Sequence, residues 1–307
     1  MSPQIQLTHR QHKVPRWHLK NFSDANGNLW CYSRNMNAVQ RKPKSVCWEI
    51  DFYEYELHGY ATGNKYERWL GKIENDAATK CQEILRGAQL GRRDAAVWAA
   101  YVASLFVRSP KCREQIRSAM TSKFKLETRG GEFIRELQHG LLKKGHLVPA
   151  DELRGIVESR RSDMERSPSY YHLAGMMSTS KSLAESLLKR TWHTLKPDAG
   201  SAFLLGDCPV ITIGLEGNRL MHGSGFNNEN ASVILPLTPQ NLFVASPPAH
   251  QWRPELTSQQ VEQLNLLTVR YARDMVVSSA NAPQITALVN REINQVTFGR
   301  DAFVPRN

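Results

Sequence analysis

The stretch RDAAVWAAYVASLFVRSP, residues 93–110, decides the fold of this chain. Residues 95–107 are apolar on most sides of a helix, which predicts a buried central helix rather than a surface one. Those 13 residues are too few to span a bilayer, and the charged residues Asp94 and Arg108 close the run. Pro110 disfavours helical geometry at Ser109, so the helix should kink or end there.

Helical periodicity continues on both sides of this stretch, and β-prone runs lie outside the helices. Short extended runs precede residue 64 and follow residue 191, separated by Gly, Pro and Asn. We therefore expect an α+β fold with a helical middle, about 64–190, flanked by short N-terminal and C-terminal β segments that meet in one sheet. The further helices are expected at 64–87, 111–127, 131–144, 150–165, 168–189 and 257–274.

The composition is that of a single globular unit. The 307 residues are 41% hydrophobic and 22% charged, which argues against disorder, and they predict one domain over 1–307 with residues 281–307 as a C-terminal extension. No apolar run is long enough for a transmembrane segment, and the N-terminus has no hydrophobic stretch typical of a secretory signal. The five cysteines are widely spaced, as expected of reduced, buried thiols. These features favour a cytoplasmic location.

The charge is strongly basic and unevenly distributed. The formal net charge is +11, and residues 1–50 hold eight Lys or Arg against two Asp or Glu. Such a surplus favours an anionic partner, RNA or DNA above all, although a solvated basic face is an equally simple interpretation. The residues expected to contact nucleic acid are Lys13, Arg16, Lys20, Arg41, Lys42 and Lys44.

The most distinctive motif is HKVPRWHLKNF, residues 12–22. Pro15 suits the first turn of a short helix, from which Leu19 and Phe22 would point inward together. His12 precedes that turn and could face a cleft. The pattern His-x-Val-Pro-x-x-x-Leu-x-x-Phe resembles the opening of a largely bacterial family, domain of unknown function 4238.

Other positions resemble the same family over about residues 9–280. The chain departs from the family pattern at Lys13, where an aromatic residue is common, at His18, where Tyr is common, and at Gly206, where Ser is usual. The family has no established activity, so the resemblance implies candidate positions and no chemistry. The matching segments are Asn26-Gly27-Asn28-Leu29-Trp30, Asp51-Phe52-Tyr53, Glu67 through Glu74, Arg108-Ser109-Pro110 and Gly206-Asp207-Cys208-Pro209-Val210.

Four of these residues have side chains suited to catalysis. His12 could act as a general acid or base, and Arg108 could clamp a phosphate or cap its own helix. Glu74 and Asp207 could hold a divalent metal such as Mg²⁺ or Mn²⁺, or one of them could be the partner base. The simpler alternatives are a solvated helix face for Glu74 and a turn-starting carboxylate for Asp207.

These observations narrow the classes of function. The chain has no P-loop, dinucleotide-binding, nucleophile-elbow or His-Glu-x-x-His signature, which disfavours ATPases, dehydrogenases, α/β hydrolases and zincins. The leading hypothesis is a nuclease-like phosphodiesterase acting on RNA or DNA, with a role in bacterial defence or stress. The alternative is a non-catalytic nucleic-acid-binding or protein-interaction component, whose basic surface only holds phosphates or keeps it in solution.

Overall fold

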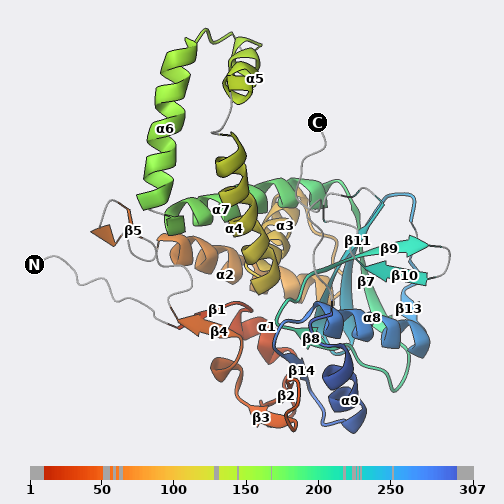
Figure 1. Cartoon of the computed structure of the whole chain (residues 1–307). Coiled ribbons are helices and arrows are strands. Elements are labelled where there is room, and N and C mark those ends of the chain that lie inside the picture. Colours follow the sequence, from red (N-terminus) through yellow and green to blue (C-terminus); the bar gives the residue numbers. More distant parts are fainter. Residues whose placement is uncertain are drawn as a thin grey trace, which may run out of the picture.

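We describe the protein from a computed structural model. It covers residues 10–295, apart from residues 51–55, 58–59, 62–64, 128–130, 144, 167, 217–218, 223–225, 227, 229 and 251. A helical bundle lies against one face of a six-stranded sheet, and a smaller four-stranded sheet lies beside them (Figure 1). The Asp51-Phe52-Tyr53 segment falls outside the described residues.

The predicted central helix is α3, Arg92–Val107, and it ends before Ser109 as Pro110 requires. All of its residues from Val102 to Val107 are buried. The helices expected around it are confirmed as α2 (Lys65–Leu85), α4 (Pro110–Glu127), α5 (Gly131–Leu142), α6 (Ala150–Arg166) and α7 (Pro168–Leu188).

The bundle has a compact base and a projecting part. Helix α3 packs chiefly against α7 and α2, whereas α5 and α6 stand away from the sheets and pack against each other (Figure 1). Within the described part of the chain, no helix combines the length and apolar character needed to cross a membrane.

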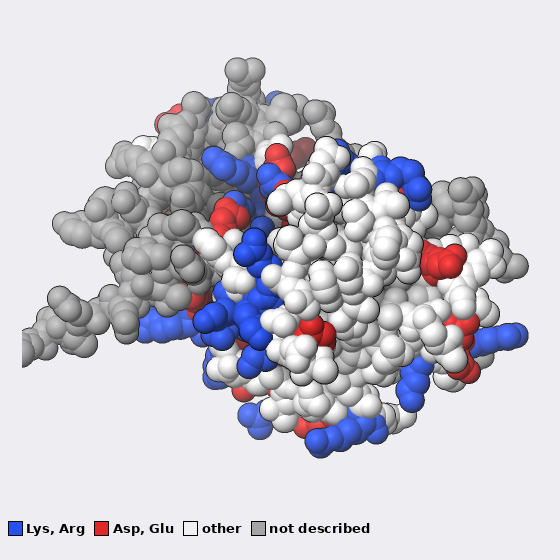
Figure 2. Space-filling view, turned by 90° about the horizontal axis from the view of Figure 1, so that it is seen from below, with Lys and Arg blue, Asp and Glu red and all other residues white. Residues whose placement is uncertain are grey.

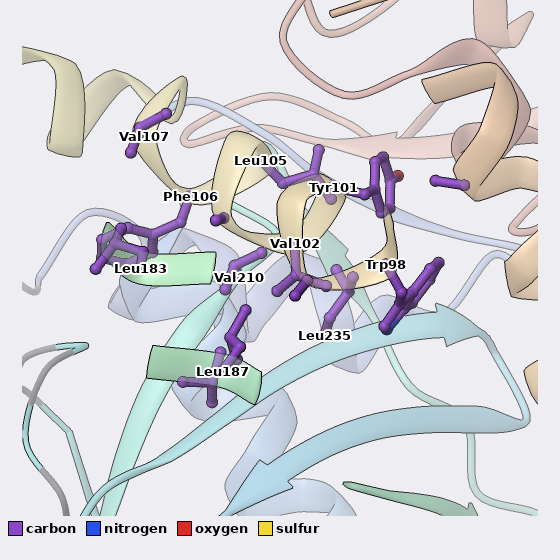
Figure 3. Close-up of a cluster of buried hydrophobic side chains, with 14 of the residues drawn as sticks. Trp98, Tyr101, Val102, Leu105, Phe106, Val107, Leu183, Leu187, Val210 and Leu235 are labelled. Carbon is purple, nitrogen blue, oxygen red and sulfur yellow. The ribbon is translucent and has the colours of Figure 1, made fainter. Parts of the chain in front are cut away.

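The main core joins the helical bundle to the six-stranded sheet. Side chains of α3 meet Leu183 and Leu187 of α7, together with Val210 and Leu235 (Figure 3). Trp98 packs edge-on against Phe243 of the sheet, with the ring centroids 5.6 Å apart. Burying a large apolar side chain in such a core contributes about 2–3 kcal/mol, so α3 anchors the whole assembly.

The six-stranded sheet has the order β10-β9-β11-β12-β7-β13. Its neighbours are antiparallel except β13, which runs parallel to β7. On the face opposite the bundle lies α8 (Ser258–Tyr271), which begins with a capping box formed by Thr257 and Gln260. The strands are β7 (Thr191–Pro197), β9 (Ile211–Glu216), β10 (Arg219–His222), β11 (Ser232–Thr238), β12 (Asn241–Ser246) and β13 (Glu255–Leu256).

The N-terminal strands take part in a second sheet, so the expectation of one common sheet is wrong. The four-stranded sheet has the order β3-β2-β14-β8, which joins strands from both ends of the chain. In the six-stranded sheet, β9 with β10 and β11 with β12 are hairpin pairs, whereas β12 returns to pair with β7. The strands of the second sheet are β2 (Leu29–Tyr32), β3 (Val39–Arg41), β8 (Leu205–Gly206) and β14 (Val276–Ser278).

Helices are not confined to the middle of the chain. The short helix α1, Arg16–Lys20, follows Pro15 as the motif predicted, and its Leu19 and the following Phe22 are fully buried. Helix α9, Pro283–Glu292, packs through Val289 against the four-stranded sheet, so part of the expected C-terminal extension belongs to the core. Two further pairs, β1 (Arg10–His12) with β4 (Trp48–Ile50) and β5 (Glu56–Leu57) with β6 (Tyr60–Ala61), complete the strands.

Candidate functional site

His12 is the last residue of β1, where it pairs in register with Trp48. A hydrogen bond to the backbone of Lys44 engages one ring nitrogen. The Nε2 atom of His12 is enclosed and has no hydrogen-bond partner among the described residues. Burial lowers the pKa of His12, the charges of Arg16 and Arg108 lower it further, and Lys44 and Glu74 oppose the shift. The net direction favours the neutral imidazole.

Glu74 and Arg108 form an ion pair beside His12. Arg108 Nη1 donates to Glu74 Oε1; the arginine side chain is fully buried, and the glutamate side chain is 23% exposed. Both charges act on the pKa of His12. Three of the four residues predicted as catalytic therefore come together. Since its guanidinium is enclosed and already holds a carboxylate, Arg108 can position Glu74 but does not present itself to solvent.

The seven-residue spacing of Glu67 and Glu74 has a structural meaning. Gln11 Nε2 donates to Glu67 Oε2 at 3.3 Å, which links β1 to helix α2. The charge of Glu74, seven residues further along the same helix face, acts on His12. Both glutamates therefore interact with consecutive residues of β1, Glu67 by a hydrogen bond and Glu74 through its charge.

Asp207, the fourth predicted residue, has a different set of neighbours. Its carboxylate accepts the backbone N–H groups of Arg273 at 2.8 Å and Asp274 at 3.0 Å, and its side chain is buried. Burial raises its pKa, which these two bonds and the charge of Lys13 oppose. The carboxylate bonds the connection between α8 and β14 and not its own turn, so its local role is to hold that connection.

The Asp207 segment is also closely packed. A Cβ added at Gly206 would lie 3.2 Å from the Cβ of Ala272, so a larger residue there would require Ala272 to shift by a few tenths of an ångström. His12 and Lys13 are consecutive, yet they interact with different groups. The charges of Glu74 and Arg108 act on His12, whereas the charge of Lys13 acts on Asp207. Alternation along an extended chain explains why neighbours meet different groups.

An open basic groove lies close to His12, which interacts with Arg16 and Lys44 of its lining but does not itself line it. Its volume is about 560 Å³, and four of the six residues predicted to contact nucleic acid line it: Arg16, Lys20, Lys42 and Lys44. All four are exposed. Arg41, in β3, is exposed but does not line the groove. Lys13 does not line it either, and its charge lowers the pKa of Asp207. Lys and Arg side chains also gather in a band on the face seen in Figure 2, which views the molecule from the side of β2 and β3.

His18 is a buried residue of the site that the sequence did not identify. Its Nε2 lies 2.7 Å from the carbonyl oxygen of Pro236, and its Nδ1 lies 2.7 Å from the hydroxyl of Tyr101. A carbonyl only accepts, so Nε2–H donates to it, and Nδ1 accepts the Tyr101 hydroxyl proton. Burial, with a smaller effect of Arg108, lowers the pKa of His18 to about 4. His18 thus attaches α1 to α3 and to the six-stranded sheet.

Glu74 and Asp207 were candidate metal ligands, and the cysteines were expected to be reduced, buried thiols. Within the described ranges, no three or more His, Cys, Asp or Glu side chains cluster as metal ligands, and Glu74 and Asp207 interact with different partners. All five cysteines are free, and four of them are buried. Burial raises the pKa of Cys31 to about 11 and that of Cys81 to about 12, as expected of buried thiols.

Comparison with known proteins gives one match. A family model described as "Protein of unknown function (DUF4238)" matches residues 10–282, which confirms the resemblance carried by the N-terminal motif. No curated protein and no solved structure matches the chain.

Proposed function

We propose that this chain, which belongs to the DUF4238 family, is a nucleic-acid-directed phosphodiesterase. The groove lined by Arg16, Lys20, Lys42 and Lys44 holds the phosphate backbone, and His12 transfers a proton at the reacting phosphodiester.

The position of His12 carries this proposal. The imidazole bonds the backbone of Lys44 and senses the charge of Arg16, which both line the groove. It also senses Glu74 and Arg108 in the buried pair. An imidazole whose neutral form is favoured, near both cations of the groove and a carboxylate, suits general acid–base chemistry on a phosphate ester.

The roles of the remaining residues follow from their exposure. The exposed cations of the groove neutralise phosphate charge, since they can reach a ligand without rearrangement of the core. Arg108 is enclosed, so it acts through Glu74 by holding that carboxylate next to His12. We assign Asp207 to positioning, because its two hydrogen bonds fix the segment after α8.

Binding without cleavage is the second candidate function, and one observation favours it. His12 Nε2 is enclosed, so turnover requires this atom to become accessible when a strand enters the groove. If it stays enclosed, the groove alone defines the function, as a site that retains nucleic acid.

One assay separates these functions. Purified protein is incubated with labelled single-stranded and double-stranded RNA and DNA in Mg²⁺, in Mn²⁺ and in EDTA, beside His12→Ala and the matched control His146→Ala, an exposed histidine. We expect cleavage by the wild type and the control and its loss in His12→Ala; the EDTA arm tells whether a metal participates. Retention without cleavage in every arm selects the binding function, and no retention at low salt contradicts both proposals and indicates a protein-interaction role.

A further inference from the structure

The four cations of the basic groove come from two separate segments of the chain. Arg16 and Lys20 are at the two ends of α1, four residues apart, which places them on one helix face about 6 Å apart along the axis. Lys42 and Lys44 flank Pro43 at the start of a short 3₁₀ helix, Pro43–Ser45. Both pairs line the same concavity, so a ligand in it meets cations from two segments of the chain.

The turn between these segments supplies the one acidic residue of the lining. Asp24 Oδ1 accepts the backbone N–H groups of Asn26 at 2.9 Å and Asn28 at 2.8 Å, and Oδ2 accepts the Gln40 amide at 3.0 Å. The carboxylate is therefore engaged by local donors and not by the groove cations. Lys42 Nζ donates to the carbonyl of Asn26, which directs that cation over the turn.

The size of the groove limits what can enter it. Its volume of about 560 Å³ lies within the roughly 300–1,000 Å³ typical of sites for small ligands. A few nucleotides of one backbone match that volume, whereas the two backbones of a duplex are held apart by their paired bases. Cations from two segments of the chain around one concavity of this size therefore fit one polyanionic strand.

We infer that the groove is built for single-stranded nucleic acid, with successive phosphates contacting Arg16 and Lys20 of one segment and Lys42 and Lys44 of the other. This inference rests on the proposed function and specifies its substrate class. Exposed bases and an exposed backbone on one strand also allow the phosphate nearest Lys44 to approach His12, since His12 bonds the Lys44 backbone.

Binding of short oligonucleotides tests the inference. Fluorescence anisotropy in a His12→Ala background, which prevents cleavage, compares a single strand with a blunt duplex of the same length over a range of salt concentrations. We expect the single strand to bind at least tenfold more tightly. Four phosphate contacts predict a slope of log K against log salt of about −3, since each contact on a single strand contributes about −0.7.

Charge-reversal variants distinguish binding in the groove from unspecific attraction by the overall positive charge of the protein. Arg16→Glu with Lys20→Glu should weaken single-strand binding more than tenfold and reduce the slope to about −1.4, that of two remaining contacts. The matched control Lys181→Glu with Arg253→Glu changes the charge equally at exposed positions that do not line the groove. Equal affinity for duplex and single strand, both lost in the groove variant, would overturn the inference and keep the proposed function. Binding that is insensitive to the groove variant would overturn both.

Discussion

The basic groove and the buried polar residues beneath it use similar side chains for opposite purposes. Arg16 and Lys20 of α1 are exposed and line the groove, whereas His18 on the same helix is fully buried and hydrogen-bonded at both ring nitrogens. Arg108 is likewise buried and paired with Glu74. Exposure, and not residue type, therefore separates the groups that can meet a ligand from those that maintain the fold. Substitutions in the two regions should differ accordingly.

The largest effect is expected at Glu74. Glu74→Ala removes the carboxylate that compensates a fully buried guanidinium, and breaking such a pair costs about 3–5 kcal/mol. The glutamate is 23% exposed, so we expect a loss of about 3 kcal/mol in the free energy of unfolding, measured by urea denaturation. Glu67→Ala, on the same helix face, serves as the control and should cost less than about 1 kcal/mol. Equal losses in the free energy of unfolding would show that the buried ion pair contributes no more to stability than the contact of Glu67.

The next effect is a loss of stability in mild acid. The folded-state pKa of His18, about 4, lies below the ordinary value of 6.5. As the pH falls, His18 therefore stays neutral in the folded protein while the unfolded chain takes up a proton. Its contribution is complete above pH 6.5 and falls as the pH drops toward 4, by about 3 kcal/mol over the whole range. Unfolding measured at intervals from pH 7 to 4 should show this decline.

The His18→Gln variant isolates this effect from the other histidines. It cannot titrate, so its stability should depend less on pH between 6.5 and 4 than that of the wild type. Identical pH dependence in the two proteins would mean that His18 is not the group responsible.

A smaller effect is expected at Asp207. Asp207→Ala removes the acceptor of two backbone N–H groups, and hydrogen bonds to a charged group are worth about 1.5–3 kcal/mol each. The raised pKa of the buried carboxyl shows that its desolvation offsets part of this gain, so we expect a net loss of about 2 kcal/mol. If Asp207 were instead catalytic, the variant would lose cleavage activity with an unchanged midpoint of unfolding.

The smallest effect on stability is expected in the groove. Lys20→Glu and Lys44→Glu change exposed residues, and such substitutions usually alter the free energy of unfolding by less than about 0.5 kcal/mol. Thermal denaturation of both variants should therefore match the wild type. A large destabilisation would show that the groove cations support the fold, which would remove the distinction between the two regions.

Periodicity in the sequence predicted the helices well and the sheets only in part. The apolar spacing along α2, α3 and α8 is a local signal, because each helix satisfies its own backbone hydrogen bonds. The sequence pattern of a strand does not identify the strand with which it pairs. Strand β2 pairs with β14, more than 240 residues further along the chain, and nothing in residues 29–32 specifies residues 276–278. The division into two main sheets was therefore not predictable from local patterns.

The candidate site, too, could be predicted only in part from local sequence patterns. Glu67 and Glu74 could be placed on one helix face from their spacing, and basic residues near the N-terminus indicated the groove. The burial of Asp207 depends on amides of residues 273 and 274, which its own surroundings do not reveal. His18 left one usable signal: it lies four residues before Phe22 and so shares its inward face, with the two rings stacked.

The pairing of β2 with β14 also determines the order in which parts of the protein can fold during synthesis. Tyr32, the last residue of β2, donates its hydroxyl proton to the carbonyl of Ala280, 248 residues further along the chain. During translation β2 therefore emerges long before its partner strand exists, while the helical bundle between them can already assemble through local contacts. The four-stranded sheet beside the groove closes only after β14 has been synthesised. A chain interrupted before β14 would thus leave β2 without this partner strand beside the basic groove.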